Sequence, residues 1–213
     1  MSWTPQANRD DVLFASGRPG HVSGSFFRQT PPFAATRATG NASANVTEEG
    51  LIISGGGTAG DIAAVDTEYI TFHKADNIPW RIFIGFQTAT NNNSTMSTDD
   101  KTAIGAFFDI DGANEGLRFD LQTMEYRVES EDPANPRASA SATDIRGRQY
   151  CYLVIDVDPG ANETTFHQGL ADETVTLNAV PDRLNEVAAA AKSEGNGENL
   201  YITEYASFPI VTT

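Results

Sequence analysis

Two acidic stretches carry residue types that could bind a metal ion: DIDGANEG at residues 109–116 and DVDPGANE at residues 156–163. Calcium takes about six to eight oxygen ligands, usually from several converging carboxylates. Asp109 and Asp111 open the first stretch as in a calcium loop, but an alanine stands at the next ligand position. Asp-Gly and Pro-Gly are strong turn formers, so we interpret both stretches as hairpin turns. A calcium site formed by Asp109, Asp111 and Glu115 remains the alternative.

Glu125 and Glu129 share one face of an expected strand, and paired carboxylates could act as acid and base in glycoside hydrolysis. Arg127 lies between them on the same face, which favours a solvated ladder of charges over a catalytic pair. The histidines are too scattered to indicate a zinc site or a Ser-His-Asp triad. They are His21, His73 and His167. We therefore predict no catalytic residues and no enzymatic activity.

Alternation and apolar runs predict β-strands for most of the chain after residue 50. Residues 116–121 and 124–129 alternate between apolar and charged side chains, as expected for strands with one buried face. Residues 79–87 and 149–157 are apolar on both faces, which is typical of central strands. Clusters of Gly, Asn, Asp and Pro separate these runs. The pattern predicts an all-β, antiparallel sandwich.

One short helix is expected in residues 181–195, which begin with proline, carry acids early and a lysine late, and stop at glycine. Two polar stretches, residues 87–101 and 130–144, are expected to be long exposed loops. Loops of this kind often carry function, but the composition of these two shows no catalytic signature.

Residues 1–40 are expected to form an irregular N-terminal arm, followed by a sandwich domain at residues 41–213. The arm is rich in Gly and Pro, which resist regular structure, and holds four arginines against two aspartates. Two interpretations stay open: the arm crosses its own domain and adds an outer strand, or it docks on a neighbouring subunit. The residues expected to bind the partner are Arg9, Phe14, Arg18, Phe26, Phe27, Arg28, Phe33 and Arg37.

The net charge of −15 argues against nucleic acid and anionic membranes as partners. Cys151, the only cysteine, stands in an apolar run and is expected to be a buried, inert thiol. The N-terminal sequence lacks the apolar segment of a secretion signal. No apolar run reaches the roughly 20 residues that a membrane-spanning helix needs.

The strand order resembles the concanavalin A-like or laminin-G-like jelly-roll sandwich over residues 45–210. Residues 148–178, RQYCYLVIDVDPGANETTFHQGLADETVTLN, resemble the family's unit of a long apolar strand, a turn and a returning strand. Residues 199–210, NLYITEYASFPI, resemble its closing strand, which returns beside the N-terminal region. The resemblance implies a jelly-roll β-sandwich. Lectins, glycoside hydrolases, lyases and structural parts of viruses share this fold, so it does not fix a function.

The basic aromatic arm and the lack of a catalytic constellation favour a non-enzymatic structural protein of a multi-subunit assembly. We expect a phage-type virion component, such as a capsid decoration or fibre-base protein, located in the virion after synthesis in the host cytoplasm. Its partners would be copies of itself in a homo-oligomer or other capsid proteins, with no cofactor beyond the calcium alternative. The alternative function is a carbohydrate-binding lectin-like module, in which Trp80 would contact the glycan. Trp80 could instead be buried in the core, which would exclude that contact. A glycoside hydrolase or lyase is the third interpretation of the function.

Overall fold

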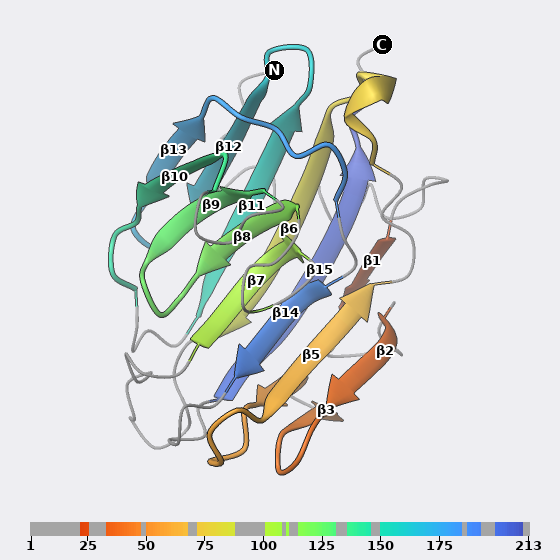
Figure 1. Ribbon diagram of the computed structural model, residues 1–213, viewed down its shortest axis with the longest axis vertical. Helices are drawn as coiled ribbons and strands as arrows, with labels where there is room; N and C mark the ends of the chain where they lie inside the picture. The colour runs from red at the N-terminus through yellow and green to blue at the C-terminus, as the bar shows by residue number, and fades with distance from the viewer. Residues whose placement is uncertain are drawn as a thin grey trace.

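The computed structural model describes the chain at residues 22–25, 33–47, 50–67, 72–87, 101–107, 110, 115–130, 136–145, 150–184, 187–192 and 199–210. These residues form two stacked antiparallel sheets, which confirms the predicted all-β jelly-roll sandwich (Figure 1). One short 3-10 turn, η2, Lys74–Asp76, precedes the central strands. The described part of the chain contains no helix with the length and apolar character that crossing a bilayer would require.

The first sheet, called sheet A, has the order β13-β12-β11-β6-β15-β4-β3, and β1 also pairs with β15. The apolar runs predicted to be central strands are β6 and β11, which lie side by side in the middle of this sheet. The strands of sheet A are β1 (Val22–Ser25), β3 (Ser43–Thr47), β4 (Gly50–Ser54), β6 (Trp80–Gln87), β11 (Cys151–Asp158), β12 (Glu163–Gln168), β13 (Glu173–Leu177) and β15 (Asn199–Pro209).

The second sheet, called sheet B, has the order β10-β9-β8-β7-β14-β5-β2. Its outer face lies toward the viewer in Figure 1. The strands of sheet B are β2 (Phe33–Ala38), β5 (Ile62–Thr67), β7 (Lys101–Phe107), β8 (Gly116–Asp120), β9 (Glu125–Glu129), β10 (Ala138–Ser141) and β14 (Val187–Lys192).

The main core lies between the two sheets and is filled by alternate residues of strands such as β6, β8, β9 and β11. Tyr126 of sheet B joins the layers, because its ring lies 4.9 Å from that of Phe119 and 5.0 Å from that of Phe166 in sheet A. Its hydroxyl donates a hydrogen bond to Glu173 at 2.8 Å. Cys151 is 2 % exposed, as the sequence predicted, and burial raises the pKa of its thiol.

The second acidic stretch is the hairpin turn that the sequence predicted. β11 pairs directly with β12, and the connection at residues 159–162 is a turn. Asn162 has a φ of 56°, the left-handed conformation that asparagine tolerates. The Asp158 carboxylate accepts the N–H of Ala161 at 3.1 Å. Asp156 lies within β11 and forms two hydrogen bonds with Arg81, so both acids have structural partners.

The helix predicted in residues 181–195 is wrong where the structure describes this segment. Residues 187–192 form β14, which lies between β5 and β7 in the interior of sheet B. Ala189 and Ala191 face the main core, while Ala190 faces the outer side of the sheet. A strand with neighbours on both edges and contacts on both faces accommodates small side chains, so tertiary packing overrides the helix propensity of alanine.

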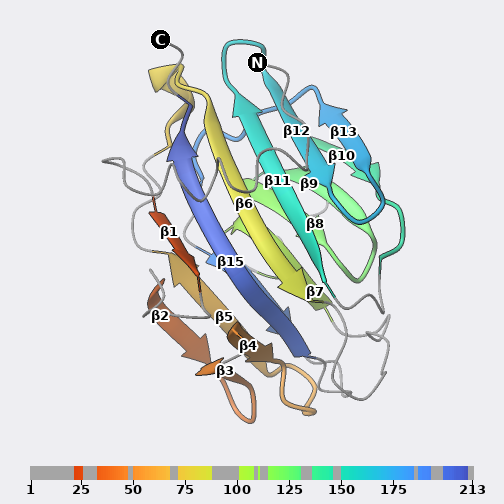
Figure 2. The same ribbon diagram turned by 180° about the vertical axis from the view of Figure 1, so that it is seen from behind.

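Two segments expected to be irregular contain strands. Within residues 1–40, β1 pairs with β15 and β2 pairs with β5 of the same chain (Figure 2). This pairing corresponds to the interpretation in which the segment adds outer strands to its own domain. Residues 1–21 and 26–32 lie outside the described residues. Within residues 130–144, expected to be a loop, Ala138–Ser141 form β10 at the edge of sheet B.

Candidate functional site

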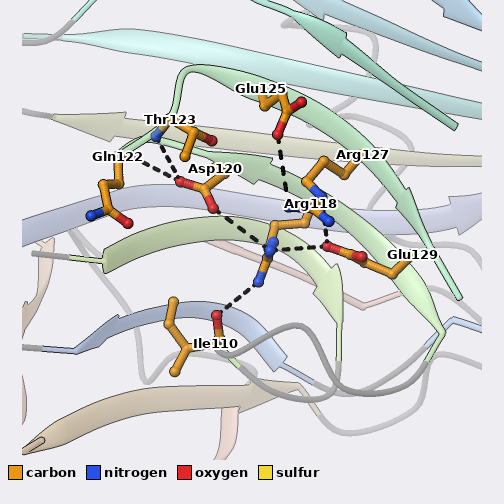
Figure 3. A network of polar contacts seen from close by, with 8 residues as sticks. All are labelled: Ile110, Arg118, Asp120, Gln122, Thr123, Glu125, Arg127 and Glu129. Atoms are coloured by element: carbon orange, nitrogen blue, oxygen red, sulfur yellow. Dashed lines mark hydrogen bonds and ion pairs between the residues drawn. The ribbon is translucent and has the colours of Figure 1, made fainter. Parts of the chain in front are cut away.

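Charged side chains gather on the outer face of sheet B, at the β8–β9 hairpin (Figure 3). The residues between them in each strand belong to the main core, so strand alternation directs the charged ones away from it. β8 contributes Arg118 and Asp120, and β9 contributes Glu125, Arg127 and Glu129. We call these five residues the charged cluster.

Glu129 lies at the centre of the charged cluster. Its Oε1 is 3.0 Å from the Nη2 atom of Arg118 and 3.2 Å from the Nε atom of Arg127. The two arginines stand directly opposite each other in the β8–β9 register, where like charges repel. Arg118 also lies 3.6 Å from Asp120, and Arg127 lies 3.7 Å from Glu125. The carboxylates therefore surround and balance the arginine pair.

The charged cluster is largely shielded from water, so the predicted solvated ladder is wrong. The side chains of Glu129 and Arg118 are 1 % and 5 % exposed. Burial raises the pKa of Glu129 above its ordinary value, and the charges of Arg118 and Arg127 oppose that rise. Within the described residues, neither oxygen of Glu129 accepts a hydrogen bond, so charge attraction is what offsets its burial.

The charged cluster fixes the chain that follows β7. The Nη1 group of Arg118 donates a hydrogen bond to the carbonyl oxygen of Ile110 at 2.8 Å (Figure 3). Ile110 is buried in a small apolar cluster with Phe107 and three alanines on the outer side of sheet B, Ala64, Ala103 and Ala190. Arg118 thus holds one residue of the acidic stretch 109–116 against the face of its own sheet.

The more accessible edge of this face carries hydrogen-bonding groups. Ser139 and Ser141 are exposed on β10 and stand opposite Arg127 and Glu125 in the register. The side chains of Glu125 and Arg127 are 31 % and 15 % exposed. We call these four residues the polar strip. The adjoining turn is rigid, because Asp120 accepts the backbone N–H groups of Gln122 and Thr123 at 2.9 and 3.0 Å.

Glu115, a predicted calcium ligand, already has partners in the fold. One carboxylate oxygen accepts a hydrogen bond from Arg137, and the other accepts the backbone N–H of Asp182 at 3.1 Å. Arg137 also bonds Asp182 at 2.8 Å and helps hold the pKa of that carboxyl below its usual range. Among the described residues, no group of three or more His, Cys, Asp or Glu side chains has an arrangement that could hold a metal ion. Both oxygens of Glu115 are thus engaged by the fold. The other two predicted ligands, Asp109 and Asp111, lie outside the described residues, so the calcium interpretation stays a prediction.

Trp80 lies in the core, as the competing expectation held. It is 5 % exposed, and its indole N–H donates to the Ser207 hydroxyl at 2.6 Å. Of the predicted partner-binding residues, Phe33 and Arg37 have their backbone in β2, paired with β5. The others lie outside the described residues: Arg9, Phe14, Arg18, Phe26, Phe27 and Arg28.

Sequence reasoning did not predict the charged cluster as a site. The signal present in the sequence is the repetition of opposite charges at alternate positions, R-x-D in one strand and E-x-R-x-E in the next. That pattern predicts that the charges share a face, which the structure confirms. It does not reveal whether the face is covered.

Solved structures with the same fold include carbohydrate-recognition domains. The chain superposes on the carbohydrate recognition domain of Emp47p with a TM-score of 0.61 at 10 % sequence identity, covering 90 % of this chain and 96 % of that one. The TM-score is 0.58 at 12 % identity for the Ca2+/Man-bound VIP36 exoplasmic/lumenal domain, covering 92 % of each chain. A protein of unknown function from Shewanella oneidensis MR-1 gives 0.62 at 12 % identity, covering 98 % and 95 %.

These likenesses identify the fold as the concanavalin A-like jelly-roll sandwich, as the sequence resemblance implied. At such low sequence identity they establish the fold alone. No family model and no curated protein sequence matches the chain.

Proposed function

We propose that this protein is a non-enzymatic, carbohydrate-binding module of lectin type. The observation that carries the proposal is the likeness to carbohydrate-recognition domains over nearly the whole of both chains. The alternative function considered from the sequence therefore replaces the virion component as the leading proposal.

The polar strip is the surface we propose for the glycan. Sugar hydroxyl groups both donate and accept hydrogen bonds, and the strip offers two serine hydroxyls, a carboxylate and a guanidinium side by side. The buried charges behind it keep Glu125 and Arg127 in place, which lowers the entropy lost on binding. No step of this proposal depends on a metal ion.

The charged cluster suits binding better than hydrolysis. A catalytic acid must reach the glycosidic oxygen of its substrate, as carboxyl pairs in glycosidases do. Burial raises the pKa of Glu129, which is the direction such an acid requires, but its side chain is 1 % exposed and lies against two arginines. The cluster is therefore better suited to supporting a binding surface than to reacting with a substrate.

A glycan array with the full-length protein tests the proposal, followed by calorimetric titration of the strongest ligand. We expect the double variant Glu125→Gln, Ser141→Ala to weaken binding by at least about tenfold, because hydrogen bonds to a charged group are worth roughly 1.5–3 kcal/mol and each 1.4 kcal/mol is about a factor of ten. Thr176→Ala is the matched control, since Thr176 is exposed on β13 of the other sheet. Failure of every glycan to bind would remove the lectin proposal. Equal weakening by the control would remove the polar strip as its site.

The virion component with protein partners stays a second proposal, and its support is the sequence of the N-terminal arm alone. None of the three similar structures described above is a virion protein by its description. Deleting residues 1–21 from a protein that assembles into particles would test it. Loss of the particles with an intact sandwich would favour assembly through the arm.

A further inference from the structure

The outer face of sheet A carries an apolar patch that is separate from the main core. Phe83 stands opposite Val154 on one side and Ala206 on the other, and all three side chains are fully buried. The partly buried rings of Tyr152 and Phe208 flank them. The rings of Phe83 and Tyr152 stack with centroids 6.0 Å apart. We call these five residues the outer patch.

The outer patch requires a cover, because sheet B lies on the opposite side of sheet A. In the part of the chain that the structure describes, no strand lies over this face, which Figure 2 shows toward the viewer. Three adjacent side chains with no exposed surface on an outer sheet face imply that other apolar groups contact them. Among the described apolar residues, Tyr152 and Phe208 are the two that pack against these three.

The N-terminal segment of the chain enters beside this patch. β1 begins at Val22, which pairs with Ser207, and the next pair joins Ser23 to Ala206 of the patch. Residues 12–15 read VLFA and are the most apolar run before β1. The six residues between them and Val22 span up to about 20 Å when extended. Three strand spacings from β1 to β11 amount to about 14 Å, so the run can reach the whole patch.

We propose that residues 12–15 dock on the outer patch of their own chain, with Phe14 against Phe83, Tyr152 and Phe208. In this proposal Phe14 binds a surface of its own chain. The proposal does not depend on the proposed glycan binding. The docked run covers the outer patch and ties the N-terminal segment to the fold.

A double-mutant cycle on the full-length protein tests the docking, with urea unfolding as the readout. Phe14→Ser and Phe208→Ser should each raise the unfolding equilibrium constant about tenfold. The double variant should raise it by clearly less than the product of the two effects, because both changes break the contact between Phe14 and Phe208. Tyr152→Ser replaces Phe208→Ser if the latter does not fold. Ile78→Ser is the matched control, because Ile78 is an exposed apolar residue outside the patch.

In the double variant Ile78→Ser, Phe14→Ser, the effects of the two changes on the unfolding equilibrium constant should multiply. Multiplicative effects of Phe14→Ser with both patch variants would overturn the proposal. If the coupling disappears on dilution and sedimentation shows self-association, docking within one chain is wrong. The outer patch would then bind residues 12–15 of a second copy. Coupling that is independent of protein concentration is the expected result.

Discussion

Replacing Arg118 by methionine tests the electrostatic basis of the charged cluster. Methionine fills much of the same space but removes the charge that lies 3.0 Å from Glu129. It also removes the hydrogen bond to the Ile110 carbonyl. Breaking a buried ion pair from one side costs about 3–5 kcal/mol, because the remaining charge stays buried with less compensation. We expect a loss of that size in the free energy of unfolding at pH 7.

The loss should depend on pH in a defined direction. Burial raises the pKa of Glu129 above its ordinary 4.5, so the folded state binds this proton more tightly than the unfolded state. The stability contributed by the protonated form is fully present below pH 4.5 and is lost as pH rises through the folded pKa. The charge of Arg118 lowers the folded-state pKa of Glu129. The Arg118→Met variant should therefore go on losing stability up to a higher pH than the wild type does. The difference between wild type and Arg118→Met should therefore shrink as pH falls toward 4.5.

Urea unfolding at pH 7 and pH 5, followed by tryptophan fluorescence, measures this difference. Trp80 is a suitable reporter because its ring is buried and its indole N–H is hydrogen-bonded. Glu129→Gln combined with Arg118→Met is the control, since it removes the charge that the arginine balances. The double variant should lose less stability than Arg118→Met alone. A pH-independent loss, or one below about 1 kcal/mol, would refute a buried charge balance as the basis of the cluster.

Three further experiments test other parts of the structure. Glu115→Gln should lower the free energy of unfolding by about 1–2 kcal/mol equally with and without calcium, because Glu115 accepts hydrogen bonds from Arg137 and from a backbone N–H. A loss seen only with calcium would indicate that Glu115 is a metal ligand. Gly105→Ala should cost about 2–4 kcal/mol, because its φ is 149° and a Cβ would collide with the Leu117 carbonyl. Gly57→Ala, with positive φ and open space, should cost less, and equal losses would contradict the collision. The Cys151 thiol should resist a disulfide reagent at pH 8 until urea unfolds the protein, and rapid labelling of the native state would contradict its burial.

The strands with clear alternation or continuous apolar character could be predicted from the sequence, because their side chains determine which faces are buried. β6, β11 and the β8–β9 pair lie where the pattern indicates. β14 could not be predicted in the same way. Its run VAAAAK has the composition of a helix, and only its place between β5 and β7 makes it a strand. Alanines in those neighbouring strands, such as Ala64 and Ala103, are the sequence signal for this close packing.

The candidate site could be predicted only in part. Alternation placed Arg118 and Asp120 on one face of β8, which the structure confirms. Their burial could not be predicted, because it depends on residues distant in sequence that cover or cross the face, such as Ile110. Arg137 and Glu115 are 22 positions apart, and no local pattern joins them. Contacts of this kind follow from the strand order rather than from any short motif.

The most direct test of the proposed lectin function is to map a bound glycan on the molecule. The best ligand from the array would be titrated into the 15N-labelled protein while amide chemical shifts are recorded. We predict saturable shifts in β9, β10 and the turn at residues 121–124, with unchanged signals in β12 and β13. An absence of binding by any glycan, or shifts confined to β12 and β13, would contradict a carbohydrate site on the polar strip.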